Sequence, residues 1–285
     1  MQYIQNFCLS SLFVTSIFLG PKHEPLGLEW KDHEGNYQKE YRLEDARFLL
    51  RLSLIVSESA YYKQEIEKPK NIQKCIVSYQ ECPLPLIRSA IPESEWNNPA
   101  VVARLFYDPN NDVLLIIFVG TINGCMAALD LSYSQVEMAG ISGYTPGMRA
   151  HRGVYLCYKS VREQIVKAVR ERLTNNTKLV ISGHSLGGAL SQLCALDFSQ
   201  HHPLHYSFAS PMIFNKASFL AFSRLVKHSY RVANASDMVA ISPLPVMPNG
   251  DAFFHTGCLV QFQKNLGSYS LNHTRAYIEE YEITP

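Results

Sequence analysis

The chain has 285 residues, of which 47% are hydrophobic and 18% are charged, and its formal net charge is +1. This is the composition of an ordinary globular protein with a sizeable core, at a length that suits one large α/β domain or two small ones. The basic and acidic residues number 26 and 25 and form no basic run, which argues against a nucleic-acid partner.

The seven cysteines include no C-x-x-C pair, which argues against a zinc site and against a complete disulfide framework. We expect no metal site, and we also expect no cofactor. Cys157 and Cys194 fall on apolar helix faces and are expected to be buried thiols. Cys75 and Cys82 are close enough in sequence to pair across a loop if the compartment is oxidising.

The apolar segment 4–19 has the length of a secretory h-region but lacks a basic n-region and a small-x-small cleavage site, and it is short for a membrane span. A first helix packed on the core fits it as well as a weak signal or anchor. Of the sequons at Asn175, Asn234 and Asn272, the last two lie beside residues assigned to the active site below, where a glycan would obstruct. A cytoplasmic or membrane-associated protein is therefore favoured, with secretion as the alternative.

The first part of the chain predicts one helix and one hairpin. Apolar residues recur at helical spacing in 43–67, whereas 68–98 contains prolines and reads as a surface loop. The strands 100–107 and 113–118 are joined by Asp-Pro-Asn-Asn-Asp, which is strong turn chemistry and predicts a hairpin.

The segment 120–151 has no firm secondary-structure signal. It carries apolar side chains that include Met126, Leu129 and Leu131. Segments of this length inside a compact domain are usually functional, and lids are one class of them.

Helices and strands alternate through the rest of the chain, beginning with an amphipathic helix at 154–173. The elements that follow are a strand at 179–181, a helix to about 199, a strand at 205–209, a helix at 216–227, a strand at 230–233, a strand or hairpin at 253–263, and a terminal helix from 274. This alternation predicts an α/β fold with a mostly parallel central sheet flanked by helices. No linker interrupts it, so we expect an apolar lead-in at 1–42 and a single domain at 43–285.

The motif GHSLG at 183–187 lies between the apolar run 179–181 and a helix-favouring segment. Strand, G-x-S-x-G and helix in this order are the nucleophile elbow. The turn is so tight that Ser185 must adopt a strained backbone conformation, and a Cβ at Gly183 or Gly187 would collide with the neighbouring strand and helix. The serine hydroxyl is then exposed at the C-terminal edge of the sheet and at a helix N-terminus, where negative charge is favoured.

A serine hydroxyl needs a base, and the base needs an acid to orient it. Sheets with this elbow supply them in the chain order serine, acid, histidine, which leaves His255 and His273. His255 lies in a strand-like run, where a structural histidine is the more common outcome. His273 follows the loop 267–270 and opens the terminal helix, so it is the preferred base and His255 is the reserve.

Asp237 is the preferred acid because it follows the strand 230–233, which places its carboxylate at the sheet edge that carries Ser185. Asp197 lies in the elbow's own helix and is too close along the chain to swing back. Asp251 follows Pro-Asn-Gly in a loop without an anchor.

The developing oxyanion needs two hydrogen-bond donors. One should be the backbone N–H of Leu186, directly after the serine. The other should come from the loop that ends the strand 113–118, where Gly120 permits close approach and Thr121 offers an N–H and a hydroxyl.

Several segments between about residue 100 and residue 281 resemble the class 3 lipase family, the fungal-type triacylglycerol lipases of the α/β-hydrolase fold. They are GHSLGGAL at 183–190, IIFVGT at 116–121, HRGVY at 151–155, SFASPMIFN at 207–215, NASDMVAISPLP at 234–245, FFHTG at 253–257 and NHTRAY at 272–277. Val119 stands where the family usually has an arginine. The resemblance implies an α/β hydrolase with a lid, and the lid falls on about 122–131.

Carried over position by position, the resemblance implies Ser185 as nucleophile, Asp237 as acid, His273 as base, and Thr121 and Leu186 as oxyanion donors. It makes the histidine of FFHTG non-catalytic, and it places the substrate-facing lid residues at Met126, Leu129 and Leu131.

The sequence thus predicts a cofactor-free serine carboxyl-ester hydrolase, foremost a lipase for acylglycerols. The predicted partners are a lipid ester substrate and a transient membrane or lipid-droplet interface. An esterase for non-lipid esters and a lipase-like binding or signalling protein without turnover are the alternatives.

Overall fold

The computed structural model describes residues 41–62, 66, 72–79, 100–122 and 132–283. The N-terminal segment 4–19, Cys82 and the predicted lid residues Met126, Leu129 and Leu131 lie outside these ranges. The predicted division into 1–42 and 43–285 stays a prediction.

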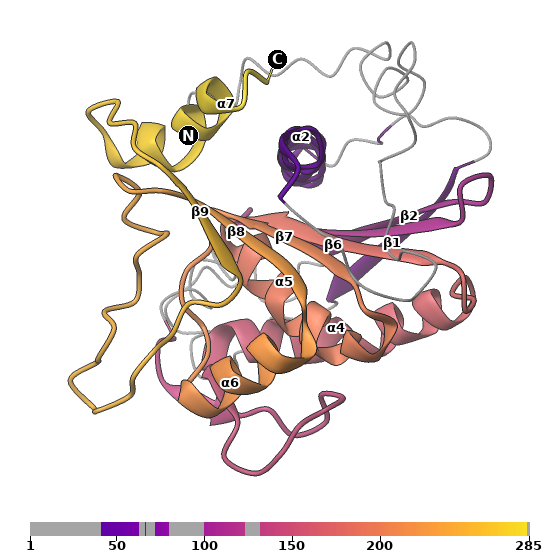
Figure 1. The fold of residues 1–285 in the computed structure, drawn as a ribbon, viewed down its shortest axis with the longest axis horizontal. Helices are drawn as coiled ribbons and strands as arrows, with labels where there is room; N and C mark the ends of the chain where they lie inside the picture. Colours follow the sequence, from indigo (N-terminus) through magenta and orange to yellow (C-terminus); the bar gives the residue numbers. More distant parts are fainter. Residues whose placement is uncertain (1–40, 63–65, 67–71, 80–99, 123–131, 284–285) are drawn as a thin grey trace.

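Within the described residues, a seven-stranded sheet in the order β1-β2-β3-β6-β7-β8-β9 forms the centre of the fold (Figure 1). Its strands are β1 (Gln73–Tyr79), β2 (Ala100–Asp108), β3 (Val113–Phe118), β6 (Lys178–His184), β7 (Leu204–Phe208), β8 (His228–Asn234) and β9 (Cys258–Phe262). The pairings of β1 with β2 and of β2 with β3 are antiparallel, and every pairing from β3 to β9 is parallel. The predicted mostly parallel sheet is therefore confirmed, as is the hairpin.

Helices cover both faces of the sheet (Figure 1). One face carries α4 (Arg152–Arg170), α5 (Leu186–Asp197) and α6 (Lys216–Leu225), and the other carries α2 (Leu43–Tyr61) and α7 (Ala276–Glu280). Each face has its own apolar core, because the strands of a parallel sheet are buried on both sides. Every residue of β3 is buried, as expected for such a strand.

The sequence pattern explains two helices on one face of the sheet. In α4 the apolar residues Val154, Tyr158 and Val161 face the sheet at helical spacing, and His151 caps the helix by accepting a hydrogen bond from the Val154 N–H at 3.4 Å. In α5 every residue is buried, because this helix lies between the sheet and α4.

Two parts of the fold differ from the sequence prediction. The predicted loop 68–98 contains the strand β1, whose alternation is weak because it lies at an exposed edge of the sheet. The segment 120–151 contains a small antiparallel pair, β4 (Gln135–Glu137) and β5 (Arg149–His151), whose strands are too short to leave a periodic signal.

Element boundaries also shift. The first helix ends at Tyr61 instead of residue 67, and in the run 253–263 only Cys258–Phe262 forms a strand. The terminal helix begins with a π-helical turn, Leu271–Arg275, and continues as α7.

The cysteine predictions have separate outcomes. Cys157 and Cys194 are buried free thiols, as predicted, and Cys75 is a partly buried free thiol.

Among the described residues, the helices include none that is long and apolar enough to cross a membrane.

One buried carboxyl group gives α2 a pH-dependent stability. Glu58 lies on this helix with 7% of its surface exposed, and burial raises its pKa from 4.5 to about 7. As the pH rises, this carboxyl loses its proton near pH 4.5 in the unfolded chain but only near pH 7 in the folded chain. The free energy of unfolding therefore falls as the pH rises from about 4.5 to about 7.

We predict that Glu58→Gln raises the melting temperature at pH 8 and leaves it nearly unchanged at pH 4, where the parent carboxyl is protonated in both states. Thermal unfolding at the two pH values measures this difference. The control is Glu163→Gln, which removes a carboxylate from the exposed face of α4. An equal effect of Glu58→Gln at both pH values would contradict the prediction.

Candidate active site

The turn between β6 and α5 has the predicted geometry. Ser185 has φ 60° and ψ −129°, a region that non-glycine residues rarely adopt. A Cβ added to Gly183 would lie 2.3 Å from the carbonyl carbon of Gly187, and one added to Gly187 would lie 2.4 Å from the Phe118 oxygen. Both glycines are therefore required by the close approach of neighbouring backbone, which confirms the expectation from the motif.

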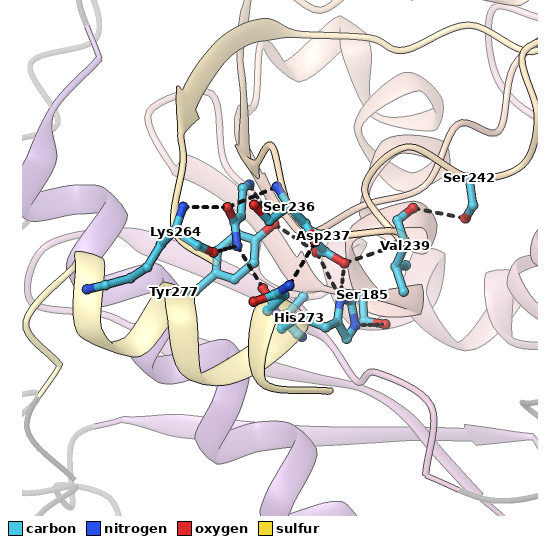
Figure 2. Close-up of polar contacts among 11 residues, drawn as sticks. Ser185, Ser236, Asp237, Val239, Ser242, Lys264, His273 and Tyr277 are labelled. Carbon is cyan, nitrogen blue, oxygen red and sulfur yellow. Dashed lines mark hydrogen bonds and ion pairs between the residues drawn. The ribbon is translucent and has the colours of Figure 1, made fainter. Parts of the chain in front are cut away.

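The structure brings Ser185, His273 and Asp237 together from three separate segments (Figure 2). The Ser185 Oγ lies 2.9 Å from His273 Nε2, and His273 Nδ1 lies 2.9 Å from Asp237 Oδ2 and 3.1 Å from Oδ1. With the proton on Nδ1, the ring donates to the carboxylate and its Nε2 accepts from the serine hydroxyl. These are the hydrogen bonds that a serine nucleophile, a base and an orienting acid require.

The Asp237 carboxylate is fully buried and is held by two further donors. The Tyr277 hydroxyl donates to Oδ2 at 2.9 Å, and the Val239 N–H donates to Oδ1 at 3.0 Å (Figure 2). Burial and the neighbouring carboxylate raise the pKa of Tyr277 well above its ordinary value, so its hydroxyl stays a proton donor. Sequence reasoning missed Tyr277. Its position one helical turn after His273 is the signal that was available.

Two asparagines tie the acid loop to the histidine segment. The Asn234 side chain donates to the Asn272 carbonyl at 3.1 Å, and the Asn272 side chain donates to the Ser236 carbonyl at 3.1 Å. Both asparagines are buried, and their amide nitrogens are engaged in these bonds. A glycan has no room at either sequon, whereas Asn175 is exposed.

His184, inside the elbow motif, supports the backbone of His273. Its Nε2 lies 2.9 Å from the His273 carbonyl oxygen, and the two rings lie 4.8 Å apart between centroids. Burial and the nearby His273 lower the pKa of His184 to about 3, so the ring is neutral and donates to that carbonyl.

The loop after β3 lies beside the elbow. A Cβ added to Gly120 would lie 3.3 Å from the His184 oxygen and 3.7 Å from Ser185 Cβ, so this backbone approaches the serine closely. Thr121 follows and is exposed, and Leu186 is the first, buried residue of α5. Both predicted oxyanion donors therefore belong to segments that flank Ser185.

Val119, at the position of the family's arginine, is fully buried in the core between the sheet and α2. Its N–H donates to the Val102 carbonyl at 2.9 Å, which extends the β2–β3 pairing by one residue. The position is therefore part of the apolar core in this chain.

The carboxylates that the sequence analysis set aside have other partners. Asp197 is nearly fully buried and pairs with Arg162 through contacts of 2.7 and 2.9 Å, and it also accepts from Tyr158 at 2.9 Å. The Asp251 carboxylate accepts from the Gln135 N–H at 3.0 Å and so ties its loop to β4.

The reserve histidine, His255, lies outside the hydrogen-bonded chain from Ser185 to Asp237. Burial and the nearby Arg231 lower its pKa to about 3. Among the described residues, no group of three or more His, Cys, Asp or Glu side chains is arranged to hold a metal ion.

The chain is similar to known lipases in its sequence. Residues 115–247 match the family model described as lipase (class 3). The secreted mono- and diacylglycerol lipase A of Penicillium cyclopium is 28% identical over 142 residues, which are 48% of this chain and 45% of that protein. A lipase of Rhizopus niveus is 31% identical over 140 residues, which are 41% of this chain and 34% of that protein. The chain thus spans less than half the length of these relatives.

Solved structures match over more of the chain. The mono- and diacylglycerol lipase of Aspergillus oryzae superimposes with a TM-score of 0.58 and 20% identity, covering 81% of this chain and 83% of that one. A triacylglycerol lipase of Penicillium expansum gives 0.55 and 17%, covering 79% and 82%. These neighbours show the same α/β fold with a mostly parallel central sheet and flanking helices.

The elbow gives a sharp prediction for stability. Gly187→Ala should lower the free energy of unfolding by about 3 kcal/mol or more, because the new Cβ meets the backbone of β3, which has no space to move. Gly120→Ala is the matched control, because its Cβ would make only a tight contact of 3.3 Å. Chemical denaturation measures both variants, and equal losses would contradict the steric account of the elbow.

Proposed function

Residues 115–247 belong to the class 3 lipase family, and from this membership and the contacts of Ser185 we propose that the protein is a serine carboxyl-ester hydrolase. The observation that carries the proposal is the continuous hydrogen-bonded chain from Ser185 Oγ through His273 to Asp237. The matched segment contains Ser185 and Asp237 but ends before His273. The contacts of His273 therefore support its proposed role as base independently of the match.

In the proposed reaction, His273 Nε2 takes the hydroxyl proton while Ser185 Oγ forms a bond to the ester carbonyl carbon. The tetrahedral intermediate collapses, the C–O bond to the alcohol breaks, and His273 returns the proton to the departing alcohol. Water then attacks the acyl-enzyme by the same route and releases the carboxylic acid. Asp237 orients the ring and stabilises the imidazolium that forms in both halves of the reaction.

The oxyanion is proposed to accept hydrogen bonds from the N–H groups of Leu186 and Thr121. Leu186 opens α5, where the helix dipole and the outward N–H groups favour negative charge. Losing one such donor typically costs about 3 kcal/mol of transition-state stabilisation.

We propose a lipid ester, foremost an acylglycerol, as the substrate. The loop that follows Asp237 exposes four large apolar side chains, and Tyr269 lies beside His273 with 59% of its surface exposed and 6.4 Å between ring centroids. We call these five residues the apolar rim: Met238, Ile241, Leu244, Val246 and Tyr269. Met238 directly follows Asp237 and Tyr269 contacts the His273 ring, so exposed apolar side chains lie next to two of the reacting groups. This arrangement suits a substrate that is presented at a lipid interface.

The base assignment is tested by exchanging each of the two candidate histidines. His273→Gln and Ser185→Ala should each lower kcat by at least about 10⁴-fold, and Ser185→Ala should abolish labelling by a fluorophosphonate probe. His255→Gln is the matched control and should keep most of the activity. A folded native protein that neither labels nor hydrolyses esters would instead support a binding protein without turnover.

The substrate class is tested on the apolar rim. Leu244→Ser should lower the rate on an emulsified acylglycerol several-fold while leaving the rate on a monomeric soluble ester nearly unchanged, because only the interface contacts this side chain. Leu220→Ser is the matched control. Leu220 is also an exposed leucine, but it lies on α6, on the opposite face of the sheet from α2 and α7 (Figure 1). Equal losses on both substrates, or no gain of the native protein at an interface, would favour an esterase for soluble esters.

A further inference from the structure

A serine of α2 holds the loop that follows β3. The Gly120 N–H donates to Ser57 Oγ at 3.0 Å, across 63 positions of the sequence. The same hydroxyl donates to the Ser53 carbonyl one helical turn earlier at 2.8 Å. Its proton is therefore used within the helix, and its lone pair is left to accept from Gly120.

The helix that carries Ser57 is itself firmly placed. Its residues Leu49, Leu52 and Val56 are fully buried in the core against the sheet. The helix packs on β6, the strand that ends in the elbow, and on β3, its neighbour. A hydroxyl on this helix is thus a fixed point relative to Ser185.

The fixed position of Gly120 matters because of what lies on either side of it. The Gly120 backbone reaches the elbow closely enough that its added Cβ would lie 3.7 Å from Ser185 Cβ. The next residue, Thr121, is the proposed second oxyanion donor. The preceding residue, Val119, is buried and apolar, so it brings no charge with which to fix the loop.

We propose that Ser57 is a positioning residue for the oxyanion hole, one that acts by holding the Gly120 amide and thereby the Thr121 N–H. The inference rests on the proposed function. A donor that has shifted weakens the bond to the developing oxyanion more than it weakens binding of the uncharged ester, so the loss should fall on kcat and not on KM.

Four variants test the inference. Ser57→Ala removes the acceptor, and Ser57→Thr restores a hydroxyl. Ser57→Cys keeps the size of the side chain with a weak acceptor and decides the question if the alanine variant does not fold. Ser59→Ala is the matched control, because this buried hydroxyl on the same helix bonds to the Val56 carbonyl at 2.9 Å.

Ser57→Ala should lower kcat on a soluble ester by about 10- to 100-fold with KM nearly unchanged. The rate of fluorophosphonate labelling should fall in parallel, and the pH–rate profile should keep its midpoint because the contacts from Ser185 to Asp237 are untouched. Ser57→Thr should recover most of the loss, and Ser57→Cys should recover less. Hydrogen exchange at the Gly120 amide, followed by NMR, should accelerate in Ser57→Ala and not in Ser59→Ala.

A kcat of Ser57→Ala within about twofold of the native value, or an equal drop in Ser59→Ala at a matched loss of stability, would overturn the inference. The failure of the proposed function looks different. In that case the native protein itself shows no hydrolysis and no labelling, and hydrogen exchange at Gly120 still reports whether Ser57 holds the amide.

Discussion

The tight contact between the start of α5 and the ends of its neighbouring strands is the constraint on which the site depends. No Cβ fits at Gly187 against β3, and one added to Gly188 would lie 2.9 Å from Ser210 Cβ, just after β7. The first turn of α5 is therefore wedged between two strand ends, and the chain reverses at Ser185 in a conformation that costs about 1–3 kcal/mol. Complete burial of α5 offsets that cost. The close contact of Gly187 with the end of β3 also places the loop after β3 beside the serine.

The surroundings of Asp237 are explained by a different requirement, because a buried carboxylate needs hydrogen-bond donors. Asp237 has no exposed surface, and its oxygens accept from His273, Tyr277 and the Val239 N–H. Asn234 and Asn272 brace the loops that bring these donors together. A carboxylate held in this way is fixed in position, which is what orienting an imidazole requires.

The sequence predicted the structure best where a chemical or steric requirement fixes the identity of particular residues. The glycines at 183 and 187 and the turn between β2 and β3 are each visible in a few adjacent residues. The order of serine, acid and histidine along the chain then reduced the candidate bases to two. The strand β1 was missed because an edge strand needs little apolar alternation. The contacts of Ser57 with Gly120 and of Tyr277 with Asp237 join residues 63 and 40 positions apart, so no local pattern predicts either pair. Only the spacing of Tyr277 from His273 gave a partial signal.

These contacts also show which segments of the chain contribute to the site. The segment that matches the lipase family, 115–247, holds the elbow and the acid, and α5 covers the sheet from one face. The base, the tyrosine that donates to the acid, and the helix that holds Gly120 lie outside that segment. They approach from the other face, on the π-helical turn before α7, on α7 and on α2 (Figure 1). A site assembled from both faces of a sheet cannot form on either layer alone. The helix α2, which lies outside the matched segment, is therefore as much a part of the proposed catalytic unit as the elbow is.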